Sequence, residues 1–318
     1  MAILVFIEHA EGVVKKSSLE AVSYAAAMGD EVIGLAVGSI DEGALKAAGN
    51  AGASKVLHVT DEKLEKGIIQ AYAQVINQAM ESTGAEILVL AKSSLGDPVA
   101  ARVAAKQGAG FVSNVSDLPD TSNGFKVKRS IYTGKAFANV EIKTDKKILG
   151  LKKNAVELKT DGSEATVEKF DVLLSDDSFK VTITSQDKAT GEILLPEAEL
   201  VVSGGRGMKG PENWGMIEEL AKTLGAATGC SKPVSDMGWR PHHEHVGQTG
   251  VKVSPQLYVA IGISGAIQHL AGVNSSKNIV VINKDPEAPF FAAADYGIVG
   301  DAFEVVPKLT EALKAAQN

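Results

Sequence analysis

The feature that most constrains the fold is an alternation of short apolar runs with helical patterns from residue 2 to residue 107. Strand-like apolar runs cover residues 2–9, 31–37, 55–60 and 86–92, and helical patterns follow them at 17–29, 41–50, 66–83 and 98–107. Strands joined by helices of this length predict a parallel sheet with helices on both faces and right-handed crossovers. The first part of the chain is therefore expected to be an α/β domain.

The pattern changes after Gly110. Residues 111–185 are rich in Val, Ile and Thr that alternate with polar residues, most clearly at 125–129, 138–142 and 179–183, and helical periodicity is missing. Alternation of period two is typical of antiparallel strands with one solvated face. We predict an antiparallel strand extension of the parallel sheet within the same domain.

A second α/β pattern follows a polar segment, residues 186–196, which reaches a proline. Strands are expected at 198–203, 256–263, 278–283 and 296–300, with helices at 212–224 and 305–316. A chain of 318 residues is long enough for two domains at about 100–200 residues each. We place the boundary between 1–190, the N-terminal parallel-sheet domain with its antiparallel extension, and 191–318, a Rossmann-like domain.

A glycine-rich turn follows the first strand of the second domain. Gly205, Gly207 and Gly210 have the Gly-x-Gly-x-x-Gly spacing, between an expected strand and an expected helix. Such glycines let backbone amides approach a phosphate at a helix N-terminus. No carboxylate follows about 20 residues later, where a ribose contact is expected. An NAD-dependent Rossmann-type oxidoreductase and a nucleotide-binding regulatory module are therefore kept as alternatives only.

Other strand ends of this domain also carry polar or small residues. A Ser-Gly-Ala turn at 264–266 directly follows strand 256–263 and begins a helix that contains His269. Exposed amides there suit a phosphate, and the helix dipole is expected to lower the pKa of His269. Asn283 and Asp301 end two later strands, where they suit ribose or adenine contacts, although both residues are common in ordinary turns.

Composition excludes several classes of protein. Cys230 is the only cysteine, which excludes intrachain disulfides and cysteine clusters and favours a reducing, cytoplasmic compartment. A net charge of −7 without a basic segment excludes nucleic acid as an expected partner, and no apolar run is long enough for membrane insertion. Adjacent side chains in the run 242–245 (His-His-Glu-His) do not converge, so no metal is predicted.

Four segments of the second domain resemble the α subunits of electron transfer flavoproteins. They are LYVAIGISGAIQHLAG at 257–272, INKDPEAP at 282–289, and the loops 203–207 and 246–250. The order and spacing agree with that family, and the resemblance spans the whole chain. It implies an FAD-binding C-terminal α/β domain, and an N-terminal domain that packs on a β subunit in a heterodimer.

The resemblance also implies the activity. Such a protein carries electrons from flavin dehydrogenases, such as acyl-CoA dehydrogenases of fatty acid β-oxidation, to a quinone reductase or another acceptor. It performs no bond chemistry on a substrate, in keeping with the lack of a nucleophile–base pair in the sequence. An electron-bifurcating flavoprotein subunit is a further alternative within the same implied family.

Contacts with FAD are implied residue by residue. Thr249 would bond near flavin N5, Gln248 would line the ring, and His269 would lie by the C2 carbonyl. The other implied contacts are His245, Val246 and Gly250 beside the ring, Arg206 and Ser231 near its face, Ser264, Gly265, Ala266 and Gln268 at the ribityl and diphosphate portion, and Asn283 and Asp301 at the adenosine end.

Lys232 departs from the family pattern, which commonly has arginine after the serine equivalent to Ser231. The implied role of this position is to stabilise negative charge at flavin N1 and O2. Lysine keeps the positive charge but loses the planar, bidentate geometry of arginine. The departure from the family pattern therefore predicts an anionic flavin semiquinone that is stabilised less strongly than with arginine.

Overall fold

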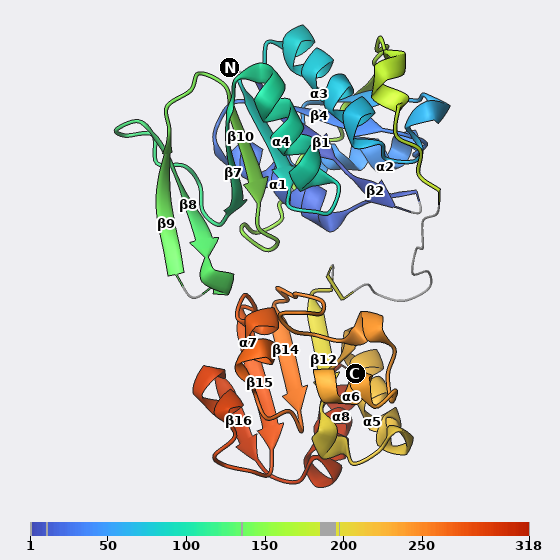
Figure 1. The fold of residues 1–318 in the computed structure, drawn as a ribbon, viewed down its shortest axis with the longest axis vertical. Coiled ribbons are helices and arrows are strands. Elements are labelled where there is room, and N and C mark those ends of the chain that lie inside the picture. Colours follow the sequence, from blue (N-terminus) through green and yellow to red (C-terminus); the bar gives the residue numbers. More distant parts are fainter. Residues whose placement is uncertain (1, 11, 135, 185–194, 197, 318) are drawn as a thin grey trace. The chain divides into compact units, whose positions relative to one another are not determined.

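The computed structural model describes residues 2–10, 12–134, 136–184, 195–196 and 198–317. The chain divides into two compact units, one of Met1–Ile131 with Ala136–Asp187 and one of Tyr132–Lys135 with Lys188–Asn318 (Figure 1). Each unit is built on its own largely parallel sheet, which confirms the predicted α/β fold class. The predicted boundary at residue 190 lies outside the described residues.

A nine-stranded sheet forms the first unit, in the order β11-β5-β4-β1-β6-β10-β7-β8-β9. The strands are β1 (Ala2–Ile7), β4 (Glu31–Val37), β5 (Lys55–Val59), β6 (Ile87–Ala91), β7 (Gly110–Val115), β8 (Phe125–Ile131), β9 (Ala136–Ile142), β10 (Lys147–Leu151) and β11 (Thr166–Lys169). Strands β11 to β7 in this order are parallel, and β8 and β9 are antiparallel. A small hairpin joins β2 (His9–Ala10) to β3 (Val13–Val14).

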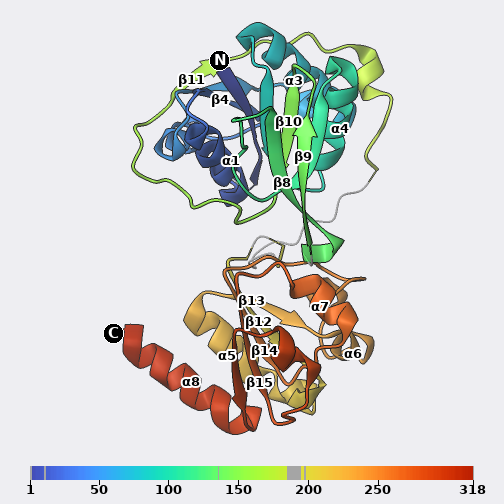
Figure 2. The same cartoon turned by 90° about the vertical axis from the view of Figure 1, so that its left-hand side faces the viewer.

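Helices cover both faces of this sheet (Figure 2). They are α1 (Lys16–Ala27), α2 (Glu42–Lys46), α3 (Ile69–Thr83) and α4 (Gly96–Gln107). Strand β1 shows why its sequence is a continuous apolar run: Ile3 and Val5 face the core that contains α1, whereas Leu4 and Phe6 face the core that contains α3 and α4. A strand buried on both faces has no polar positions to alternate with.

The antiparallel extension is only partly as predicted. The hairpin β8–β9 is antiparallel, but β10 returns into the sheet between β6 and β7, parallel to both. Its residues Ile148 and Leu149 are fully buried, as expected for an interior strand. Strand β11 joins the opposite edge, and residues 179–183 form no strand. Phe179 ends a short 3₁₀ turn and packs, with Ile183, against the α3 side of the core.

The second unit has a five-stranded sheet in which all neighbouring strands are parallel, in the order β13-β12-β14-β15-β16. The strands are β12 (Leu200–Gly204), β13 (Ala227–Cys230), β14 (Leu257–Ile261), β15 (Asn278–Asn283) and β16 (Tyr296–Val299). In chain order this is 2-1-3-4-5, a doubly wound arrangement whose direction reverses between β12 and β14. Ligands of such sheets bind beyond the carboxyl ends of the strands at this reversal.

Three main helices flank the second sheet: α5 (Gly215–Leu224), α7 (Ile267–Val273) and α8 (Ala302–Gln317). Side chains of α5 and α8 share one core with Val202 and Ile261, whereas α7 contributes to the core on the other face with Tyr258 and Phe290. The helix after β12 and the helix after β14 lie on opposite faces, so the loops that lead into them diverge at the carboxyl edge, where ligands of this fold bind.

Candidate functional site

Two glycine loops meet at the reversal of the second sheet. The Gly205 N–H donates to the carbonyl of Ile261 at 2.8 Å, and the Gly207 N–H donates to that of Gly262 at 3.0 Å. A Cβ on Gly205 would lie 2.2 Å from the Gly262 oxygen. Only glycine allows the loop after β12 to approach the loop after β14 so closely.

This contact corrects the interpretation of the Gly-x-Gly-x-x-Gly spacing. Two 3₁₀ turns, Arg206–Met208 and Pro211–Asn213, separate the loop from α5, so no long helix begins directly at the glycines within the described residues. The Lys209 ammonium lies 4.5 Å from the ring centroid of Phe303, and Arg206 is exposed. The glycine spacing therefore serves loop packing rather than a dinucleotide fingerprint.

The loop 245–250 is held between two elements at the same edge. The Val246 N–H donates to the carbonyl at the end of β13 (2.9 Å), and the Gln248 N–H donates to the carbonyl of Gln268 on α7 (2.7 Å). A Cβ on Gly250 would lie 2.2 Å from the carbonyl oxygen of His245. The side chains at 248 and 249 are exposed, so the loop presents an amide and a hydroxyl to solvent at the carboxyl edge.

Two histidines at this edge are buried: one begins the loop 245–250 and the other lies on α7. His245 is 3% exposed and His269 is 6% exposed. The Nε2 atom of His269 lies 2.9 Å from the hydroxyl oxygen of Tyr258, whereas the Nδ1 atoms of both histidines lack a hydrogen-bond partner of standard geometry among the described residues. Both nitrogens have almost no accessible surface, so they are enclosed by the loop 245–250 and α7 rather than open to solvent.

Burial keeps both histidines neutral. It lowers the pKa of His269 to about 4, with a smaller contribution from His245, while the backbone of Val246 opposes the shift. Burial also lowers the pKa of His245, and His242 adds to that effect. The direction of the predicted pKa shift of His269 is confirmed, but its main cause is desolvation rather than the helix dipole. His269 is buried and does not lie on the helix surface.

Acid is expected to destabilise the second unit through His269. Between its ordinary pKa of 6.5 and its folded pKa of about 4, the unfolded chain binds a proton that the folded chain does not. The free energy of unfolding should therefore fall as pH drops from about 6.5 to about 4, by about 3 kcal/mol in total, and level off below. Urea titrations at pH 7 and pH 5 measure the loss, which is about 2 kcal/mol at pH 5.

His269→Gln should remove most of this pH dependence, whereas His243→Asn, at an exposed position of the same unit, should leave it intact. An equal loss between pH 7 and pH 5 in wild type and His269→Gln would assign the acid sensitivity to other groups.

Asn283 and Asp301 are occupied by turn and cap contacts. The Asn283 amide donates to the carbonyl of Ile263 at 3.0 Å, and its oxygen accepts from the N–H of Asp285 at 3.0 Å. Asp301 accepts from the N–H of Phe303 at the start of α8. These contacts position the loops after β15 and β16 at the carboxyl edge. The adenosine contacts of these two residues stay a prediction.

Lys232 begins the short helix α6 (Lys232–Asp236) directly after Ser231, which occupies the N-cap position without a side-chain capping hydrogen bond. Its ammonium nitrogen lies 2.7 Å from Oδ2 of Asp236, and both side chains are about half exposed. Lys232 is near enough to lower the pKa of His245 by its charge. The structure therefore brings this lysine near His245, with a carboxylate partner that the sequence did not suggest.

The remaining predicted residues lie on the same edge. Ser264, Ala266 and Gln268 are exposed where β14 leads into α7, and Gly265 is buried between them. The carboxyl edge of the second sheet thus brings together the predicted contacts from all five strand ends.

The run 242–245 has a structural role that the sequence did not reveal. Glu244 is 3% exposed and accepts two hydrogen bonds from Arg240, at 2.9 Å to Nε and 2.5 Å to a terminal nitrogen. Arg240 also donates to Glu218 at 2.8 Å. Within the described part of the chain, no group of three or more potential ligands could hold a metal. The four-residue spacing of Arg240 and Glu244 is the sequence feature that could have indicated this ion pair.

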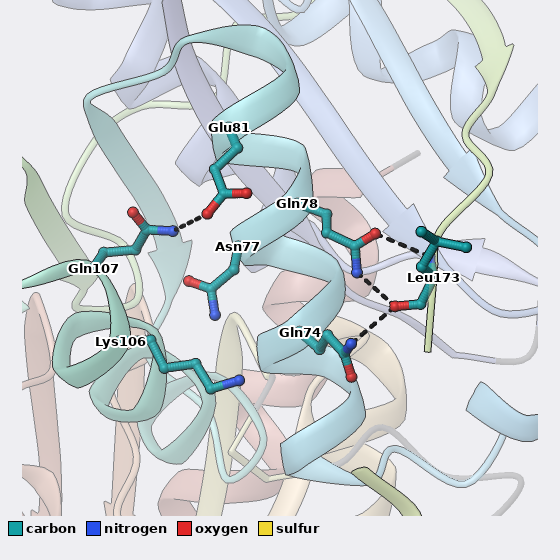
Figure 3. A pocket seen from close by; sticks show the side chains of 7 residues that line it. All are labelled: Gln74, Asn77, Gln78, Glu81, Lys106, Gln107 and Leu173. Atoms are coloured by element: carbon teal, nitrogen blue, oxygen red, sulfur yellow. Dashed lines mark hydrogen bonds between the residues drawn. The ribbon is translucent and has the colours of Figure 1, made fainter. Parts of the chain in front are cut away.

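A separate pocket lies in the first unit, between α3 and α4 (Figure 3). Its lining residues are Gln74, Asn77, Gln78, Glu81, Lys106, Gln107 and Leu173. Gln74 and Gln78 each donate to the carbonyl of Leu173 at 2.8 Å, which fastens that segment to α3. Asn77 is 8% exposed, and its amide atoms lack partners among the described residues. None of the predicted FAD contacts lies in this pocket.

Among the described residues, no helix is both long and apolar enough to span a bilayer.

Together, the doubly wound sheet and the polar loops at its carboxyl edge are typical of an α/β protein that binds a nucleotide cofactor there. Comparison with protein families identifies which one. Residues 3–175 match the electron transfer flavoprotein domain, and residues 194–274 match the electron transfer flavoprotein FAD-binding domain. The chain belongs to the electron transfer flavoprotein α-subunit family, and its second unit contains the FAD-binding domain.

Relatives match along almost the whole chain. The electron transfer flavoprotein subunit alpha of Bacillus subtilis is 38% identical over 98% of this chain and 97% of its own length. A protein of Syntrophomonas wolfei with the same name is 36% identical over 98% of each chain. The probable mitochondrial subunit alpha of Caenorhabditis elegans is 38% identical over 98% of this chain and 93% of its own. These matches favour the flavoprotein over the NAD-dependent alternative.

Proposed function

We propose that the chain works as the α subunit of a heterodimer, in which it binds one FAD at the carboxyl edge of the second sheet and carries electrons between other flavoproteins. The observation that carries this proposal is that the exposed side chains of Gln248 and Thr249 and the exposed turn at 264–266 lie at the carboxyl edge of the sheet within the family's FAD-binding domain. The partner is a β subunit, on which residues 1–190 pack.

The residues at the carboxyl edge have different proposed contacts with FAD. Gln248 and Thr249 are proposed to present side chains to the flavin ring from the loop that is fixed to α7, and His245 and His269, whose pKa values burial lowers, are proposed to lie beside the ring. The exposed turn at 264–266 lies where the phosphates are proposed, and Asn283 and Asp301 lie toward the adenosine. Arg206 follows β12, and Ser231 and Lys232 follow β13; all three are proposed to lie near the flavin. FAD, when bound, supplies the electron-transfer chemistry.

The chain itself is proposed to perform no bond chemistry. The buried His269 is hydrogen-bonded at Nε2 to the Tyr258 hydroxyl rather than to a serine or a carboxylate. Flavin dehydrogenases, such as acyl-CoA dehydrogenases, are the proposed donors, and a quinone reductase or another acceptor takes the electrons onward. A cytoplasmic location stays a prediction from the single cysteine.

Anaerobic reduction tests this function. The complex with the β subunit should be yellow, and a catalytic amount of acyl-CoA dehydrogenase with its substrate should bleach the flavin absorbance, whereas NADH alone should not. FAD content separates the alternatives, because one FAD per heterodimer fits simple transfer and two fit a bifurcating protein. A colourless complex that binds NAD would contradict the proposal.

A further inference from the structure

Strand β9 is an unprotected edge of the nine-stranded sheet. Among the described residues it is the last strand of that sheet and pairs with β8 alone (Figure 1). Its seven residues, Ala136–Ile142, include no proline and no bulge, and Glu141 is its single charged residue. The opposite edge strand, β11, has four residues, two of them charged. Native proteins normally shorten, charge or cover an edge, because an unpaired strand binds other chains.

Hydrogen bonds on the far side of β8 show how the backbone of this hairpin is turned. Lys126 exchanges two hydrogen bonds with Asp120, at 2.8 and 3.0 Å, and the carbonyl of Lys128 accepts from the N–H of Ser116 at 3.0 Å. Successive residues of an antiparallel strand direct their backbone groups to opposite sides. The even-numbered residues of β8 therefore face away from β9, and the odd-numbered residues bond to it.

The register transfers this alternation to β9. Each odd-numbered residue of β8 lies directly opposite an even-numbered residue of β9. Opposite residues of a bonded pair exchange both of their hydrogen bonds, so the even-numbered residues of β9 are the ones that bond to β8. The N–H and C=O groups of the odd-numbered residues point to the free edge, and the side chains of these residues are exposed. They are Phe137, Asn139 and Glu141.

We propose that an extended, acidic strand of the β subunit adds to β9 through these outward backbone groups. The inference rests on the proposed function, which makes the chain one subunit of a heterodimer. In strand addition, main-chain hydrogen bonds supply the affinity and the neighbouring side chains supply the specificity. Phe137 is 55% exposed, and its ring centroid lies 4.6 Å from the Lys128 ammonium. An apolar residue of the added strand would cover this ring as a cross-strand pair.

Charge favours a different chain over a second copy of this one. Residues 117–147 carry seven basic and four acidic side chains, in a chain whose net charge is −7. Lys126 and Lys128 lie directly opposite Glu141 and Asn139, so positive charge lies beside the free edge. Pairing of β9 with the same strand of a second copy would bring two such positive segments together, which costs repulsion, whereas an acidic strand would be attracted.

Hydrogen exchange resolved to single amides tests the arrangement in the FAD-loaded heterodimer. The amides of Phe137, Asn139 and Glu141 should exchange about as slowly as those of Ala138 and Val140, which bond to β8 within the chain. If the three outward amides exchange at the rate of unprotected amides, while the two inward amides are slow, no strand is added and the proposal is overturned.

Proline at the edge tests the same contact through affinity. Asn139→Pro removes an outward N–H without removing a hydrogen bond to β8, and proline is tolerated at edge positions of this kind. The dissociation constant of the FAD-loaded heterodimer, measured by dilution of a labelled complex, should rise about tenfold. Asn139→Ala is the matched control, because it removes the side chain but keeps the N–H, and it should bind as wild type does. Equal affinities of the two variants would contradict strand addition.

A pair of charge variants keeps the test open if Asn139→Pro does not fold. Asn139→Asp places a carboxylate beside the acidic strand and should weaken the heterodimer, whereas Asn139→Lys should leave it unchanged or tighten it. Tighter binding by Asn139→Asp than by Asn139→Lys would overturn the proposed charge of the partner strand. Light scattering of the full chain without its β subunit should show a monomer. A dimer that Asn139→Pro dissociates would assign the edge to a second copy instead.

Failure of this inference differs from failure of the proposed function. A heterodimer that lacks FAD or takes no electrons from a flavin dehydrogenase contradicts the function, whatever β9 binds. A yellow, reducible heterodimer in which Asn139→Pro binds the β subunit as tightly as wild type overturns the strand addition alone.

Discussion

Arg240→Ala is expected to lower the free energy of unfolding of the second unit by about 3–5 kcal/mol. The reason is that Glu244 would stay buried without the cation that binds both of its carboxylate oxygens. Both tryptophans of the chain, Trp214 and Trp239, belong to the second unit, so urea unfolding followed by tryptophan fluorescence reports on it.

An exposed ion pair of the same spacing is the control. Asp236→Ala breaks the contact with Lys232, in which both side chains are about half exposed, and should cost less than about 1 kcal/mol. Replacing both buried partners, as Arg240→Met with Glu244→Leu, should restore much of the stability, because no uncompensated charge is left. Equal losses in Arg240→Ala and Asp236→Ala would show that Glu244 is not held as the structure has it.

Gly265→Ala should abolish most FAD binding and destabilise the second unit by about 2–5 kcal/mol. Gly265 has a φ of +85°, which L-residues with a Cβ rarely adopt, and a Cβ there would lie 2.4 Å from the backbone nitrogen of Phe290. The neighbouring backbone cannot move aside as a flexible side chain would. FAD absorbance per purified heterodimer and urea unfolding measure the two effects.

Gly215→Ala is the matched substitution. Gly215 begins α5, and a Cβ at that position meets no heavy atom within 4 Å. Its FAD content should be unchanged and its stability unchanged or slightly raised, since alanine favours helix. If Gly265→Ala retains FAD as well as Gly215→Ala does, the turn after β14 does not need its left-handed glycine.

Local periodicity predicted the elements better than it predicted their neighbours. The apolar run of β1 predicted a buried strand, and its side chains pack into the cores on both faces of the sheet. The place of β10 could not be predicted in the same way. Its apolar residues follow an antiparallel hairpin along the chain, yet they pair with β6 and β7. Strand order depends on long-range packing, which local patterns do not encode.

The candidate site shows the same division. Parallel strands bring their carboxyl ends to one edge, so polar and small residues at 248, 264 and 283 could be expected to lie together. The glycine spacing at 205–210 suggested a dinucleotide fingerprint, but glycine is equally required where two loops pack closely. The packing partner, Gly262, lies far along the chain, so local spacing could not reveal it. Tyr258 was hidden in an apolar strand, although a buried tyrosine hydroxyl needs a partner.

Hydrogen exchange of the heterodimer before and after FAD removal tests the central claim most directly, that FAD binds at the carboxyl edge of the second sheet. The account predicts that FAD slows exchange of backbone amides at 246–250 and 262–269, with little change in α3 and α4 of the first unit. Protection confined to the first unit, for example around the pocket at Asn77, would contradict it.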